Sequence, residues 1–195
     1  ERPNVGDDTR HWGPPFLEDL QGNPTEFSAY FICANRGKKS LAIDITTEAG
    51  QAQVQALALH ADIVIENFKV DGLKKYGLDY QSLLEIKSDL IYCSITGFGQ
   101  TGPKAEQAGY DAMIQASGGL MSITGEVDGK PGAGPQKVGV AACDLMTGMY
   151  AVSGILAALH HRNNTGEGQY IDLALFDTQV AWLANQASNY LVSGN

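Results

Sequence analysis

The sequence is poor in basic residues and in cysteine, and both shortages exclude classes of function. Lysine and arginine number 13 against 22 acidic residues, which gives a net charge of −9. Binding along a nucleic-acid backbone needs a basic footprint, so we expect no nucleic-acid partner. The three cysteines, Cys33, Cys93 and Cys143, lack the paired spacing of a zinc site or of a disulfide framework. We therefore expect small buried thiols and no metal.

The sequence also lacks an uninterrupted apolar run near the roughly 20 residues that cross a bilayer. Residues 1–4 are polar and do not resemble a secretory signal. From these two absences we expect no membrane partner and a cytoplasmic location, with the mitochondrial matrix as the alternative in a eukaryote. With 195 residues, 44 % of them apolar, the chain can bury one good-sized core.

The few basic residues gather in two short stretches. Residues 36–39 and 74–75 hold five of the 13 lysines and arginines. Such stretches suit a small anionic ligand, but they also suit an ordinary solvated face. The residues alone leave both interpretations open.

Strands and helices are expected to alternate along the chain. Prolines and glycines in residues 1–30 predict an extended, irregular segment. Short apolar runs then predict strands at 41–45, 62–66, 90–95 and 170–174, and helical patterns or capping residues predict helices at 46–60, 80–87, 110–117, from Asp144 onward and at 177–191. This alternation is typical of the α/β class, with a Rossmann-like parallel sheet flanked by helices.

Asp144 lies at a position where an aspartate could either cap a helix or act as a nucleophile. It lies at the predicted start of the long helix, where aspartate is a favoured N-cap residue. The positive end of the helix dipole would lower the pKa of its carboxyl, and an ionised carboxylate can act as a nucleophile. Asp111, at another predicted helix start, is expected to be a cap. The residues alone do not decide between the two roles of Asp144.

Seven separate stretches have the residues and the order found in one family, and together they span nearly the whole chain. They are residues 1–10, 35–40, 66–68, 76–78, 94–97, 109–111 and the segment around Asp144. In these stretches the chain resembles the class III CoA-transferases, the family of formyl-CoA transferase and carnitine CoA-transferase. Residues 12–16 and 91–97 look most similar to succinate–hydroxymethylglutarate CoA-transferases.

The resemblance implies a role for individual positions. Asp144 matches the catalytic aspartate of the family, and CoA or acyl-CoA is implied as substrate. The positions that match CoA-binding ones, including a strand end beside the adenine pocket and a loop beside the thioester, are Arg2, Ile43, Thr46, Asn67, Phe68, Lys69, Lys75, Gly109 and Tyr110. Arginine and lysine at such positions suit phosphate, and arginine also stacks on adenine.

The implied reaction moves CoA from an acyl-CoA, such as succinyl-CoA, to a carboxylic acid acceptor. Asp144 would form a mixed anhydride and then an aspartyl-CoA thioester, which divides a difficult exchange into easier steps. The resemblance also implies a homodimer with small-molecule partners. Residues 1–160 are expected to be a large CoA-binding domain without its first strand, and 161–195 to lead toward a second domain. The segment alone is expected to be inactive.

Two other functions remain open. An α-methylacyl-CoA racemase of the same family would carry His where this chain has Tyr110, and a phenol that titrates near pH 10 is a poor base at neutral pH. A noncatalytic CoA-binding module would use Asp144 only as a helix cap.

Overall fold

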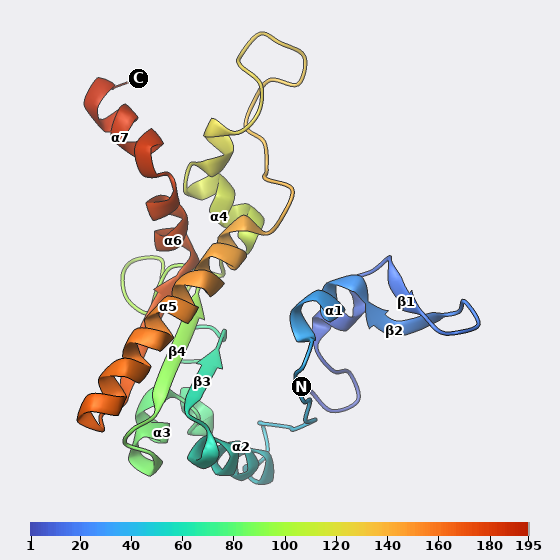
Figure 1. Ribbon diagram of the computed structural model, residues 1–195, viewed down its shortest axis with the longest axis vertical. Helices are drawn as coiled ribbons and strands as arrows, with labels where there is room; N and C mark the ends of the chain where they lie inside the picture. The colour runs from blue at the N-terminus through green and yellow to red at the C-terminus, as the bar shows by residue number, and fades with distance from the viewer. Residues whose placement is uncertain (195) are drawn as a thin grey trace. The chain divides into compact units, whose positions relative to one another are not determined.

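The computed structural model describes residues 1–194, and Asn195, the last residue of the predicted C-terminal segment, lies outside them. The chain forms two compact units, Glu1–Ala56 and Leu57–Asn195 (Figure 1). The expected boundary near residue 160 concerns a longer protein and stays a prediction, although β5, which follows that boundary, belongs to the sheet of the second unit.

The first unit is built from short elements. They are η1 (Asp8–His11), β1 (Phe16–Glu18), β2 (Pro24–Ser28) and α1 (Ala29–Asn35). The strands β1 and β2 pair antiparallel across a turn in which the Asp19 carboxylate accepts from the backbone N–H groups of Gln21 and Asn23. Ser28 caps α1, because its hydroxyl accepts from the N–H of Phe31 (3.0 Å). The prediction of an irregular segment was therefore wrong for residues 16–28, where a local turn brings two short strands together.

The predicted strand at 41–45 is also wrong. The backbone nitrogen of Glu1 donates to the carbonyl of Leu41 (2.7 Å), and Ile43 N–H donates to the carbonyl of Glu1 (2.9 Å). These two bonds flank Ala42 in the pattern of parallel pairing. They form a single bridge, and a strand needs a ladder of successive bonds. Residues 41–44 are therefore irregular in the structure despite their apolar pattern.

Helix α2 (Glu48–His60) follows, and Thr47 caps it by accepting from the N–H of Gly50 (3.1 Å). The second unit contains the sheet, formed by β3 (Ile63–Glu66), β4 (Ile91–Thr96) and β5 (Gln169–Ala174) in the order β3-β4-β5. All neighbouring strands are parallel, with Ile65 opposite Cys93 and Cys93 opposite Ile171. Three of the four predicted strands and the parallel α/β architecture are thus confirmed.

Helices and helical turns complete the second unit. They are η2 (Lys74–Tyr76), α3 (Tyr80–Ile86), α4 (Asp111–Ser117), η3 (Leu120–Ile123), α5 (Ala142–Thr165), α6 (Leu175–Trp182) and α7 (Ala184–Ser193). The predicted last helix is divided in two at Ala184, which has a positive φ of 46°.

The two faces of the sheet are covered differently. Helix α5 runs along one face (Figure 1), where Ala151 and Ile155 pack on the buried Cys93 and on partly buried strand residues. On the other face Tyr80, at the start of α3, stacks on Tyr170 with ring centroids 4.9 Å apart. The core of the unit therefore lies around β4, the central strand.

Helix α5 is the one helix within residues 1–194 whose length and composition would allow it to cross a membrane, with a mean hydropathy of 1.5 over its most apolar stretch. The sequence argument considered only uninterrupted apolar runs and did not detect it. A core helix of a soluble protein passes the same test. The helix buries one side against the sheet, while Leu145, Met149, Val152 and Leu156 on its other side are exposed.

Candidate functional site

The start of α5 brings together two aspartates that lie 33 residues apart in the sequence. The N-cap position of α5 is Ala141, which has no side chain able to cap, so Asp144 is the third residue inside the helix. Asp111, the first residue of α4, supplies the missing acceptor, because its Oδ1 accepts from the backbone N–H of Cys143 (2.8 Å). The expectation that Asp144 caps this helix is wrong. Asp111 caps α5 from a neighbouring helix instead of capping its own.

Asp144 has no hydrogen-bond or ion-pair partner within the part of the chain that the structure describes. The residue is exposed, but packed neighbours displace part of the water around its carboxylate. This partial desolvation raises the pKa of Asp144, and the nearby Asp111 carboxylate raises it further. The sequence predicted a lowered pKa from the helix dipole. In the structure, desolvation and the like charge of Asp111 shift this pKa in the opposite direction.

Gln115 holds Asp111 in place, and sequence reasoning missed it. Its side chain is fully buried, and its amide donates to Asp111 Oδ2 (2.8 Å) and to the carbonyl of Val140 (3.3 Å). Its carbonyl oxygen accepts from the N–H of Val138 (2.9 Å). One amide thus ties α4 to the loop that leads into α5. The available signal was a glutamine four residues after Asp111, on the same helix face.

The thiol beside this pair is not a competing nucleophile. Burial raises the pKa of Cys143 to about 12, and the charges of Asp111 and Asp144 add to the effect. A thiol with such a pKa stays protonated at neutral pH, and only the thiolate is nucleophilic. Cys143 and Cys93 are buried as expected, whereas Cys33 is exposed, contrary to expectation.

Gly109 and Tyr110 lead directly into the acidic pair. A Cβ on Gly109 would lie 2.4 Å from the Cα of Gly97, and a Cβ on Gly97 would lie 2.6 Å from the Cα of Gly109. The loop after β4 and the loop before α4 therefore touch through backbone that only glycine allows. Tyr110 is the N-cap residue of α4, and its side chain points into solvent with 76 % of its surface exposed.

Three further predicted residues follow the carboxyl end of β3. Asn67 donates from its side chain to the carbonyl of Ile95 in β4, and the N–H of Phe68 donates to the Glu66 carboxylate (2.7 Å). Phe68 and Lys69 are exposed. Ligands of parallel α/β sheets bind beyond the carboxyl ends of the strands, and this is where the structure places these residues. Lys75 lies in η2, with its Nζ 4.7 Å from the ring centroid of Tyr76.

A cavity of about 240 Å³ lies beneath the segment that follows β3. Its walls are polar and aromatic, and they include Lys69, Tyr80, Ser94, Gln100 and Tyr170. The volume falls below the roughly 300–1,000 Å³ of usual small-molecule sites, so this cavity could hold only part of a large ligand.

The remaining predicted residues belong to the first unit. Arg2 is exposed and forms an ion pair with Asp8. Ile43 is joined to the backbone of Glu1, the residue before Arg2, so the structure brings Arg2 and Ile43 together. Thr46 donates to the Asp44 carboxylate from its backbone (2.9 Å) and from its hydroxyl (2.6 Å).

A second cavity, of about 300 Å³, lies within the first unit. Arg10, Lys38 and Lys39 contribute to its walls, together with Glu1 and Phe31. Lys38 and Lys39 of the basic stretch 36–39 thus border this cavity, as expected of residues that bind an anion. Within residues 1–194 no group of three or more His, Cys, Asp or Glu side chains is arranged to hold a metal ion.

Comparisons with known proteins agree on one family. The family model described as CoA-transferase family III matches residues 1–195. The succinate–glutarate CoA-transferase of Agrobacterium fabrum is 57 % identical over 194 residues, which are 100 % of this chain and 47 % of that protein. The human succinyl-CoA:glutarate CoA-transferase is 46 % identical over 98 % of this chain and 41 % of that protein.

A solved structure shows the same similarity. The crystal structure of a CaiB/BaiF family protein from Brucella suis superposes with a TM-score of 0.92 at 56 % identity, covering 100 % of this chain and 50 % of that one. The chain thus spans about half the length of the proteins it matches.

Proposed function

The chain belongs to CoA-transferase family III, and from this premise we propose that the protein containing it transfers CoA from an acyl-CoA to a free carboxylic acid. We propose succinyl-CoA as donor and a dicarboxylate such as glutarate as acceptor, because the relatives above carry these acids in their names. We also propose that the protein acts as a homodimer in the cytoplasm or the mitochondrial matrix, without a membrane partner.

The observation that carries this proposal is the unpartnered carboxylate of Asp144 beside Asp111. Its ionised form is disfavoured by partial desolvation and by a like charge. Attack on an acyl-CoA carbonyl converts that carboxylate into an uncharged anhydride and so removes the repulsion. An aspartate that served only as a helix cap would accept backbone N–H groups, and here Asp111 accepts the N–H of Cys143.

In the proposed reaction an oxygen of Asp144 forms a bond to the acyl carbon as the C–S bond breaks and CoA leaves as thiolate. The thiolate then attacks the aspartyl carbonyl, which releases the first acid and leaves an aspartyl-CoA thioester. The acceptor carboxylate attacks this thioester, releasing thiolate and forming a second anhydride. Attack of the thiolate on the acceptor's acyl carbon forms the new acyl-CoA and restores the Asp144 carboxylate.

The residues that match CoA-binding positions of the family are proposed to contact CoA. Arg2, Ile43 and Thr46 are assigned to its adenine nucleotide, and Lys75 to its 3′-phosphate or pyrophosphate. The other assigned residues are Asn67, Phe68, Lys69, Gly109 and Tyr110. The backbone contact between Gly97 and Gly109 holds the loop before α4, which is proposed to lie beside the thioester, against the loop after β4.

The test uses the full-length protein with succinyl-CoA and a panel of carboxylic acids, and mass spectrometry identifies the acyl-CoA products. Asp144→Asn should lower transfer by about 10³-fold or more, because an amide cannot form the anhydride. Asp177→Asn is a matched control, since Asp177 is also the third residue of its helix, α6. Hydroxylamine added during turnover should modify Asp144 alone. Near-normal transfer by a folded Asp144→Asn protein would refute the assignment.

A further inference from the structure

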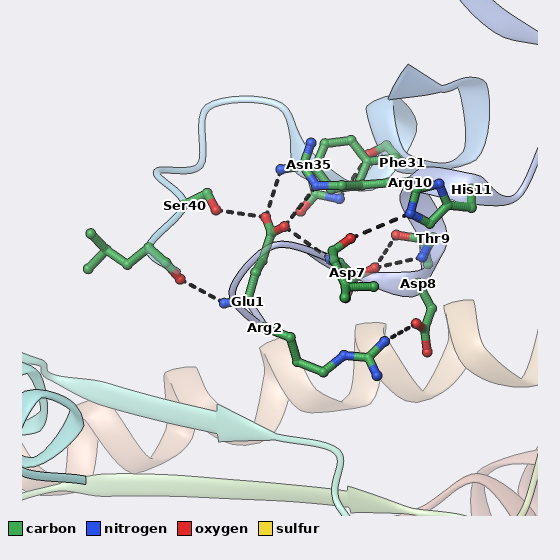
Figure 2. A network of polar contacts seen from close by, with 12 residues as sticks. Glu1, Arg2, Asp7, Asp8, Thr9, Arg10, His11, Phe31, Asn35 and Ser40 are labelled. Carbon is green, nitrogen blue, oxygen red and sulfur yellow. Dashed lines mark hydrogen bonds and ion pairs between the residues drawn. The ribbon is translucent and has the colours of Figure 1, made fainter. Parts of the chain in front are cut away.

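Arg10 is the most firmly held charged side chain of the first unit. Its guanidinium carbon lies 4.1 Å from the ring centroid of Phe31 and 5.3 Å from that of Phe27. Its Nε and Nη2 donate to the two carboxylate oxygens of Glu1, at 2.7 and 2.9 Å (Figure 2). Only 17 % of its side-chain surface is exposed. Two parallel hydrogen bonds and the two neighbouring rings restrict the guanidinium, a set of contacts that lysine cannot reproduce.

Two further groups hold the Glu1 carboxylate. The Ser40 hydroxyl donates to its Oε1 (2.7 Å), and the N–H of Asp7 donates to its Oε2 (3.0 Å). Arg10 is the main cause that lowers the pKa of Glu1 to about 2, and Ser40 is the next. The absence of a side chain at Gly6 leaves room for the ion pair of Glu1 and Arg10, because a Cβ there would lie 2.9 Å from both Arg10 Cδ and Glu1 Oε2.

The position of Glu1 determines where its neighbours lie. The Glu1 carbonyl accepts from Ile43, and the carbonyl of Arg2 accepts from Gly6 (2.9 Å), so the backbone is held on both sides of Arg2. The Arg2 side chain itself is largely exposed and bonds Asp8 through one nitrogen, Nη2. Its remaining N–H groups are available to a ligand.

We propose that Arg10 is a positioning residue for the nucleotide end of CoA. Through Glu1 it fixes the backbone that presents Arg2 and Ile43, and it thereby sets the affinity for an adenosine 3′,5′-bisphosphate group without contacting that group. The proposal rests on the proposed function, which assigns Arg2 and Ile43 to CoA. It adds a residue that belongs to none of the stretches assigned to ligand contact.

The experiment is a double-mutant cycle in the full-length protein, with adenosine 3′,5′-bisphosphate and free CoA titrated calorimetrically. Arg10→Lys should weaken binding of both by about tenfold. In an Arg2→Ala background the same change should alter affinity by less than about twofold, because Arg2, the charged residue that Arg10 positions, is gone and only the backbone at Ile43 still depends on Arg10. Arg162→Lys is the matched control and should leave affinity unchanged, since Arg162 also pairs with a carboxylate, that of Asp62 (2.9 Å).

Steady-state kinetics separate positioning from general stability. Arg10→Lys should raise the KM for acyl-CoA and leave both kcat at saturation and the KM for the acceptor acid unchanged. Unaltered nucleotide affinity in Arg10→Lys overturns the proposal. So does an equal loss with and without Arg2, which would mean that Arg10 touches the ligand from the adjoining cavity, or a parallel loss in kcat. If the wild-type protein binds no CoA, the proposed function fails, and this proposal fails with it.

Discussion

The interiors of the two units of this chain are stabilised by different forces. In Glu1–Ala56 the one buried apolar side chain is Phe31, and the unit is organised around the ion pair of Glu1 and Arg10. In the second unit buried apolar side chains surround β4 and are covered by α5. The stability that an ion pair provides depends on pH, whereas the stability that apolar packing provides depends on how completely side chains fill the core. The two units should therefore fail under different perturbations, and each can be tested with the other as its internal control.

The largest effect is expected from a cavity in the second unit. Ile155, 8 % exposed, packs between α5 and the sheet, so Ile155→Ala should lower the free energy of unfolding by about 2–5 kcal/mol. Leu156→Ala, at the next position but 60 % exposed, should change it by less than about 0.5 kcal/mol. Urea unfolding of the full-length protein measures both. Equal losses in the two variants would mean that another part of the protein covers Leu156.

An intermediate loss of stability is expected in the first unit at low pH. The pKa of Glu1 is lowered to about 2 in the folded chain, whereas an unperturbed glutamate titrates near pH 4.3. A lowered carboxyl pKa contributes stability that is present above the unfolded pKa and is lost as pH falls through the folded one. The protection factors of amides in residues 1–10, taken relative to the intrinsic exchange rate at each pH, should therefore fall between about pH 4 and pH 2, while β4 amides stay protected. Glu1→Gln should abolish this pH dependence, and a wild-type profile in that variant would exclude Glu1 as its origin.

The smallest expected effect is a gain in stability, and it concerns Asp144. Because the pKa of Asp144 is raised, its ionised form destabilises the fold, and this cost disappears as pH falls toward the unfolded pKa. Asp144→Asn should thus slightly increase stability at pH 7, by less than about 1 kcal/mol because the residue is exposed. The gain should vanish near pH 3. A loss of stability at pH 7 in thermal unfolding would show that the helix dipole outweighs the repulsion by Asp111.

Patterns confined to a few neighbouring residues predicted much of the second unit. The β-branched residues of β3 and the apolar run of β4 predicted strands, and the helical spacing of Ile155 and Leu159 predicted α5. The same method failed at residues 41–45, whose pattern suits a strand but whose backbone meets only a single bridge to Glu1. It also missed β1 and β2, which lie among prolines and glycines and lack the consecutive β-branched residues of β3.

For the candidate site, the sequence alone singled out Asp144 and Asp111 and, through the family resemblance, Arg2, Asn67 and Tyr110. It assigned Asp144 the wrong structural role and the wrong direction of pKa shift. It also missed Gln115 and Arg10, which contact no expected ligand. A buried amide and a stacked guanidinium acquire their roles from partners on other elements, and no local pattern indicates those partners.

By itself, then, the sequence determined the parallel α/β core and the family, because periodicity and motifs depend on residues close together in the chain. Only the tertiary structure decided which aspartate caps α5, since Asp111 and Cys143 are 32 residues apart, and which groups surround Asp144. It also decided that Arg10 pairs with Glu1 beside two aromatic rings. Hydrogen bonds, desolvation and repulsion between charges depend on distances between atoms that exist only after the chain has folded.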